Sequence, residues 1–268
     1  MNTIGSSSVS KKFITLSLGF RKQNLHALYD LLLFFGVGTG LVVFLDWFFL
    51  HFPKGEPSLT LMISVNTLVA LSFFLFATAL MRNRGLSWKD MGIRAPESFL
   101  RTVFWGILLC LVAFLLFITL EAMESYFLSD FDRLEKLNET HDKRPSVSDH
   151  LGGGSPLWFI VYMLGPYAWI HVALFEEMIM RGFVFHRFEK LFDWLPSGVA
   201  VPLVIILQGI IFGAIHIRGQ GFEGFIVVSC LGIIVGAVFV ASGRNLWAVV
   251  LGHGLGTMLP MINDVVYR

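Results

Sequence analysis

Long apolar stretches separated by short polar segments make up most of this chain. A helix that crosses a bilayer needs about 20 mostly apolar residues. Stretches of this kind occupy residues 27–50, 58–81, 99–122, 157–180, 199–217, 223–242 and 245–262. The pattern therefore predicts an all-α fold, a polytopic integral membrane helical bundle with about seven (six to eight) transmembrane helices that enclose a polar intramembrane site.

Polar residues between the spans indicate an orientation in the membrane. The N-terminal tail and the 82–98 segment are each rich in Lys and Arg, whereas the 51–57 segment carries only Lys54. By the positive-inside rule, the N-terminus and the 82–98 loop are expected to be cytoplasmic. The longest polar segment, 123–156, would then lie outside, either as a plain connector or as a flexible lid.

The composition agrees with a membrane protein. Hydrophobic residues make up 55% of the chain and charged residues 15%, compared with about 25% charged residues in soluble domains. The net charge of +1 gives no basic field that would attract nucleic acid. Cys110 and Cys230 both fall within predicted spans and are expected to be packed thiols. Residues 1–268 are interpreted as one integral membrane domain.

Charged residues inside the fourth span indicate a functional site. Glu176, Glu177 and Arg181 lie in apolar sequence, where each charge costs several kcal/mol. Glu177 and Arg181 can pair across one helical turn. Glu176 points about 100° away around the helix, and a carboxylate held in an apolar cavity can take a proton from water. The alternatives are a structural polar network or the proton or ion site of a transporter.

Two histidines lie in equally apolar surroundings. Phe212 and His216 share one helix face, and the small residues between them permit close approach of another helix. His216 either bonds to a neighbour or shares a water molecule with Glu176. His253 stands among three glycines, one turn before Thr257. These last two side chains either stabilise an oxyanion or belong to a helix-packing seam.

The predicted spans conflict with the idea of one site. Alternating spans place Glu176 near the inner end of the fourth helix and His216 near the outer end of the fifth. The two residues can meet only if a helix is broken, for which Gly165-Pro166 is the expected position, or if a span is tilted or re-entrant. Residues 183–194 alternate aromatic and charged side chains, and are expected to extend the fourth helix into the interface.

No metal site is expected from the spacing. Two histidines and two carboxylates are suitable zinc ligands by type, so zinc is the alternative to a site without cofactors. However, the sequence has no His-Glu-x-x-His, and no spacing imposes a tetrahedral site.

Residues 160–260 resemble the CPBP family of intramembrane proteases, which comprises type II CAAX prenyl proteases and bacteriocin-processing or immunity proteins. The family's Glu-Glu-x-x-x-Arg motif is matched by residues 176–181 and its Phe-x-x-x-His motif by residues 212–216. Its third motif, His followed four residues later by Asn or Asp, is matched only at His253, because Thr257 occupies the last position. The region is interpreted as the motif-bearing catalytic core.

The resemblance implies roles for these residues. Glu176 is the expected general base, His216 its partner in activating water, and His253 an oxyanion donor, with Thr257 as a possible second donor. Glu177, Arg181 and Phe212 are expected to shape the site. These roles predict an intramembrane endopeptidase acting on a membrane-embedded or lipid-modified peptide. The alternatives are a non-catalytic family member that binds a partner and, ranked last, a proton- or ion-coupled transporter.

Overall fold

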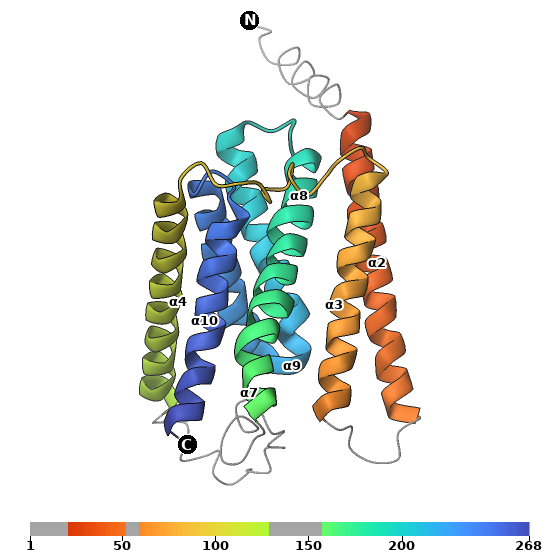
Figure 1. Cartoon of the computed structure of the whole chain (residues 1–268). Helices are drawn as coiled ribbons and strands as arrows, with labels where there is room; N and C mark the ends of the chain where they lie inside the picture. The colour runs from red at the N-terminus through yellow and green to blue at the C-terminus, as the bar shows by residue number, and fades with distance from the viewer. Residues whose placement is uncertain (1–20, 52–58, 129–156, 268) are drawn as a thin grey trace, which may run out of the picture. The chain divides into compact units, whose positions relative to one another are not determined.

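The computed structural model describes residues 21–51, 59–128 and 157–267. They form long helices, and no strand occurs in these three ranges (Figure 1). The helices are α2 (Lys22–His51), α3 (Leu59–Arg82), α4 (Phe99–Leu128), α7 (Leu157–Tyr162), η1 (Met163–Phe175), η2 (Met178–Val184), α8 (Phe185–Leu191), α9 (Ser197–Ala241) and α10 (Leu246–Tyr267). The N-terminal tail and residues 129–156 of the predicted connector or lid lie outside the described residues.

Seven helical stretches in the described part of the chain are long and apolar enough to cross a membrane. They are Lys22–Leu45, Ser64–Arg82, Phe99–Thr119, Leu157–Leu191, Ser197–Ile217, Gln220–Ala241 and Leu246–Asn263. The predicted all-α, multi-pass membrane fold is therefore confirmed. Cys110 and Cys230, which were expected to be packed thiols, are free and only partly buried.

The fourth span is one helix of 35 residues, from Leu157 to Leu191. It is not broken at Gly165-Pro166: Pro166 lies inside η1, where the helix winds as a π-helix. Such winding is rare and is frequently found at functional sites. The helix also continues beyond the apolar stretch 157–180 to Leu191, which confirms that the residues that follow this stretch extend the fourth helix. Glu176 is therefore close to the middle of the fourth span and not near its inner end. The fourth helix thus no longer prevents Glu176 and His216 from lying at a similar depth.

Helix α9 contains a sharp kink that separates the fifth and sixth spans. Gly221 has φ 69° and ψ −168°, a conformation that glycine adopts without the steric cost of a Cβ atom. After the kink the chain returns alongside the preceding segment. A Cβ on Gly213 would lie 2.5 Å from the carbonyl oxygen of Phe225 and 2.9 Å from the amide nitrogen of Ser229. The predicted close helix approach at Gly213 is therefore confirmed.

The described residues belong to two compact units, and each is described by itself. The first contains Met1–Ser87 and Ile179–Gln208, with α2 packed against α3 and α8. Asn24 is completely buried, and its Nδ2 atom donates to the carbonyl oxygens of Lys190 (2.6 Å) and Leu191 (3.2 Å). Because the last carbonyls of a helix lack partners within it, Asn24 fastens α2 to the end of α8.

The second unit contains Trp88–Met178 and Gly209–Arg268. Helix α10 packs against α4 and η1, and α4 and α10 lie side by side in Figure 1. A Cβ on Gly252 would lie 2.8 Å from the carbonyl oxygen of Gly106, and one on Gly254 would lie 2.6 Å from the Trp169 ring. Glycines at these positions therefore allow α4 and η1 to approach α10 on either side of His253.

Candidate active site

A hydrogen bond joins the fourth span to α10 inside the second unit. Nδ1 of His253 lies 2.7 Å from Oε1 of Glu177. The Glu177 side chain is completely buried, and that of His253 is 20% exposed. A buried carboxylate needs compensating hydrogen bonds or charge, and His253 supplies one such contact. The contact orients the imidazole of His253 through its Nδ1 atom.

Phe212 packs against both histidine rings. Its ring centroid lies 4.8 Å from that of His216, with an interplanar angle of 68°. The corresponding values for His253 are 6.4 Å and 89°. Phe212 is itself buried. The structure therefore brings His216 and His253 together around one aromatic side chain, although they lie on different helices.

The hydrogen bond of His216 determines its tautomer. Nδ1 lies 2.7 Å from the carbonyl oxygen of Phe212, one turn earlier in α9. Because a carbonyl oxygen only accepts, Nδ1 must carry the proton and donate it. In the neutral imidazole, Nε2 is then an acceptor. This nitrogen can accept a hydrogen bond from water.

The remaining predicted residues occupy different environments. Glu176 follows η1 directly and is partly exposed, whereas the neighbouring Glu177 is fully buried. Thr257 is partly exposed and lies one turn after His253 on α10. Arg181 is buried but belongs to the first compact unit. Its pairing with Glu177 stays a prediction.

The glycines around His253 were interpreted either as a helix-packing seam or as space beside an oxyanion site, and the structure contains features of both. Gly252 and Gly254 lie against neighbouring helices, as a packing seam requires, whereas a Cβ on Gly256 would meet no atom within 4 Å. The seam therefore fixes α10, and open space is left on the turn between His253 and Thr257.

The analysis of the sequence alone missed two side chains in η1. The rings of Tyr167 and His171 are stacked, with centroids 4.9 Å apart. Nδ1 of His171 is buried and has no hydrogen-bond partner among the described residues. The signal was available, because His171 is a further ionisable residue within the same apolar run as Glu176.

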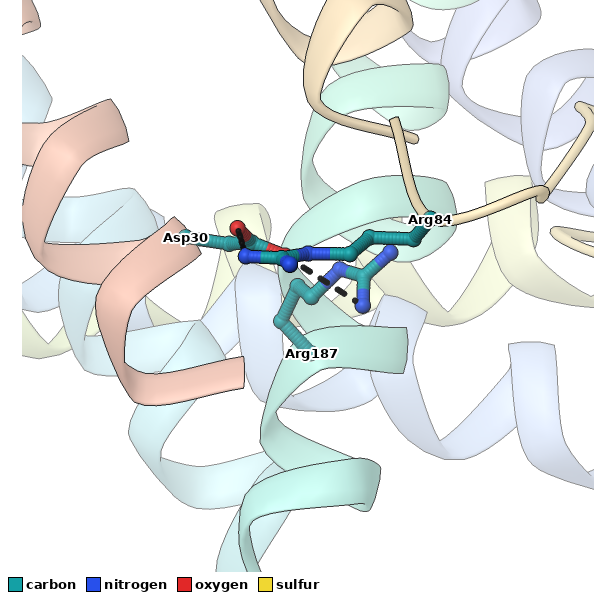
Figure 2. Close-up of polar contacts among 3 residues, drawn as sticks. All are labelled: Asp30, Arg84 and Arg187. Atoms are coloured by element: carbon teal, nitrogen blue, oxygen red, sulfur yellow. Dashed lines mark hydrogen bonds and ion pairs between the residues drawn. The ribbon is translucent and has the colours of Figure 1, made fainter. Parts of the chain in front are cut away.

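A charged cluster in the first unit was also missed. Asp30 is 1% exposed, and its two carboxylate oxygens accept hydrogen bonds from Arg84 at 2.8 and 3.2 Å. Nη1 of Arg187 lies 3.5 Å from the same carboxylate, as Figure 2 shows. Arg187 is buried, so this part of residues 183–194 does not have the exposed interfacial position expected for it. Asp30, a carboxylate inside the first apolar stretch, was the available signal.

The hydrogen bond to Asp30 favours the protonated form of Arg84. The pKa of Arg84 is raised above its ordinary value, chiefly by the hydrogen bond to Asp30 and further by the carboxylate charge, whereas burial lowers it. Arg84 therefore stays protonated at any pH near neutrality.

Within residues 21–51, 59–128 and 157–267, no three His, Cys, Asp or Glu side chains gather in a way that could hold a metal ion. The histidines and carboxylates of the candidate site thus fit a zinc ion poorly. The expectation of a site without cofactors stays a prediction.

Comparison with known proteins gives one family. Residues 156–259 match the family model described as type II CAAX prenyl endopeptidase Rce1-like. The matched region includes all the predicted site residues, namely Glu176, Glu177, Arg181, Phe212, His216, His253 and Thr257. The match confirms the resemblance that these motifs carry. No match was found among curated proteins or among solved structures.

Proposed function

We propose that this multi-pass membrane protein, whose residues 156–259 match the family model described as type II CAAX prenyl endopeptidase Rce1-like, is an intramembrane endopeptidase. It hydrolyses a peptide bond of a membrane-embedded or lipid-modified substrate. The observation that carries the proposal is the position of Phe212 between the rings of His216 and His253. Ionisable groups among apolar helices are costly to desolvate, so they are rare there unless they have a function. Catalysis is such a function.

Water activation is assigned to Glu176 and His216. Nε2 of His216 accepts a hydrogen bond from the water, since Nδ1 is occupied by the Phe212 carbonyl. Glu176 takes one water proton as the water oxygen attacks the substrate carbonyl carbon. The proton then passes to the leaving nitrogen as the C–N bond breaks, which returns Glu176 to its ionised form.

Oxyanion stabilisation is assigned to His253 and Thr257. Oε1 of Glu177 accepts a hydrogen bond from Nδ1 of His253 across the 2.7 Å contact, as it would from a doubly protonated imidazole ring. In that form Nε2 also donates, and its proton can meet the negative charge that develops on the substrate oxygen. The Thr257 hydroxyl supplies a second donor from the next turn of α10.

The position of these groups supports the proposed substrate class. The site residues are on helices long and apolar enough to span a membrane, so a lipid tail or transmembrane segment can reach them from the bilayer. The mechanism needs no metal ion, because the proton acceptor and the oxyanion donors are all side chains of the chain. The cytoplasmic position of the N-terminus is part of the proposal and rests on loop charge.

Peptide cleavage by the purified protein in liposomes tests this function. The substrates are membrane-anchored peptides with and without a prenyl group, and each assay is repeated with a chelator. Glu176→Gln is expected to abolish cleavage, whereas Glu223→Gln, at an exposed carboxylate of α9, is expected to retain it. Full cleavage by Glu176→Gln would refute the mechanism, and cleavage that the chelator stops would establish a metal site instead.

Partner binding without catalysis is the second candidate. The observation in its favour is Thr257, at a position where the related motif has Asn or Asp. A cellular phenotype that survives both Glu176→Ala and His216→Ala would establish this role in place of proteolysis.

A further inference from the structure

The second unit contains a polar hollow away from the candidate active site. It lies where α4 begins and where the turn from α9 to α10 passes, and it is partly open to the surroundings. Its charged and hydrogen-bonding side chains include those of Arg94, Glu97, Ser98, Arg101, Trp105 and Asn245. Two arginines and one glutamate give the lining a net charge of +1.

Three membrane spans have an end at this hollow. The span Phe99–Thr119 starts there, Gln220–Ala241 finishes there, and Leu246–Asn263 starts there. The hollow therefore lies at the depth where the hydrocarbon core gives way to lipid headgroups. Trp105 suits this depth, because its ring is apolar and its indole N–H is polar.

Arg94 and Arg101 each have more N–H donors than the one hydrogen bond that each makes to the backbone. Arg94 donates from Nη2 to the carbonyl oxygen of Gly243 at 3.2 Å, and Arg101 donates from Nη2 to that of Ala241 at 3.4 Å. These contacts hold the end of α9, which is a structural role. Each guanidinium carries five N–H donors in a fork that matches phosphate oxygens. Both side chains are exposed, so further donors face the surroundings.

Apolar side chains next to the hollow distinguish a lipid from a free anion. Phe99, Leu100 and Phe104 are 74%, 78% and 59% exposed on the first two turns of α4. In a membrane, such side chains are covered by acyl chains. A ligand with an anionic head and two apolar tails therefore complements both the hollow and the adjoining face of α4.

We propose that the hollow at the start of α4 binds the phosphate headgroup of an anionic phospholipid. Arg94 and Arg101 donate to the phosphate, and the acyl chains lie along Phe99, Leu100 and Phe104. Basic pockets between transmembrane helices at the headgroup level bind anionic lipids by this chemistry. Glu97 opposes the binding and limits its strength.

Lipid titration of the full chain in detergent, followed by native mass spectrometry, tests the site. Phosphatidylglycerol is expected to bind more tightly than phosphatidylcholine. Arg94→Gln and Arg101→Gln are each expected to weaken phosphatidylglycerol binding about fivefold, since one cation near anionic lipid contributes about 1 kcal/mol. Lys89→Gln removes an exposed cation from the same loop but outside the hollow, and is expected to leave binding unchanged.

Glu97→Gln provides an independent arm, because it alters no hydrogen bond that holds α9. It is expected to tighten phosphatidylglycerol binding, and unchanged affinity would contradict the site even if the arginine variants fail to fold. Equal binding of the two lipids, or equal losses with Lys89→Gln and Arg101→Gln, would overturn the proposal. Inorganic phosphate that displaces the lipid completely at millimolar concentration would show that the site takes the free anion instead.

Discussion

His253 and Glu177 are 76 residues apart in the sequence, yet Nδ1 of His253 lies 2.7 Å from a carboxylate oxygen of Glu177. The contact connects α10 to the middle of the fourth span and orients the imidazole of His253. The two neighbouring carboxylates thus lie in different environments: Glu177 is buried against a histidine, whereas Glu176 is partly exposed.

Glu177→Gln tests the orientation of His253. The amide oxygen still accepts from Nδ1, but it no longer stabilises the doubly protonated ring, so Nε2 ceases to donate. Loss of one oxyanion donor is expected to lower kcat by about 100-fold. KM should change little, because the lost interaction forms in the transition state. Steady-state kinetics on a cleaved peptide give both values, and a change confined to KM would contradict the assignment.

His216→Ala tests the proposed water partner. We expect kcat to fall by about 10²- to 10⁴-fold, the usual range for loss of a group that assists proton transfer. The matched control is His51→Ala, because His51 makes the same 2.7 Å contact from Nδ1 to the carbonyl oxygen four residues earlier. If both variants reduce cleavage equally, the local helix contact rather than catalysis explains the effect.

Thr257→Val removes a hydroxyl while keeping the shape of the side chain. If this hydroxyl donates to the oxyanion, kcat should decrease by about 100-fold, and Thr257→Asn should restore most of the rate with its amide donor. Single-turnover cleavage measures the chemical step directly. Wild-type rates in Thr257→Val would leave His253 as the donor and remove Thr257 from the mechanism.

Gly213→Ala tests the close contact inside α9. The new Cβ would lie 2.5 Å from the Phe225 carbonyl oxygen, so the two halves of the helix must separate. We expect a loss of about 1–3 kcal/mol in the free energy of unfolding, measured by denaturation in detergent. At Gly198 a Cβ meets no atom within 4 Å, and Gly198→Ala is expected to be neutral or stabilising. Equal effects would refute the contact.

Asp30→Asn tests the charged cluster of the first unit. The substitution leaves Arg84 and the buried Arg187 side by side without their carboxylate, which is expected to cost about 3–5 kcal/mol of stability. Arg82→Gln, at an exposed arginine nearby, should change stability by less than about 0.5 kcal/mol. Thermal unfolding of both variants in detergent decides the matter, and a neutral Asp30→Asn would contradict a structural role.

The cluster also predicts how stability varies with pH. Because the pKa of Arg84 is raised by Asp30, its contribution is present below the unfolded-state pKa and is lost only when pH rises through the higher folded-state value. Arg84 therefore contributes no pH dependence between about pH 6 and 9. A decline in stability within that range that Arg84→Gln abolishes would contradict this.

The sequence by itself determined the membrane class, the seven spans and the motifs that match the family model. These properties are local: about 20 apolar residues suffice to mark a span, and each motif occupies one or two turns of a helix. Helix ends were less well determined. The fourth apolar stretch ends at residue 180, whereas its helix continues to Leu191 through residues that were expected to extend it.

Only the tertiary structure decided which of these residues meet. The contact of Glu177 with His253 and the position of Phe212 between two histidines depend on how separate helices pack, and apolar periodicity carries no information about such distant pairing. The Asp30 cluster was hidden for the same reason, since its members are 54 residues or more apart. Spacing along a helix identifies which side chains share a face, whereas packing against neighbouring helices selects their partners.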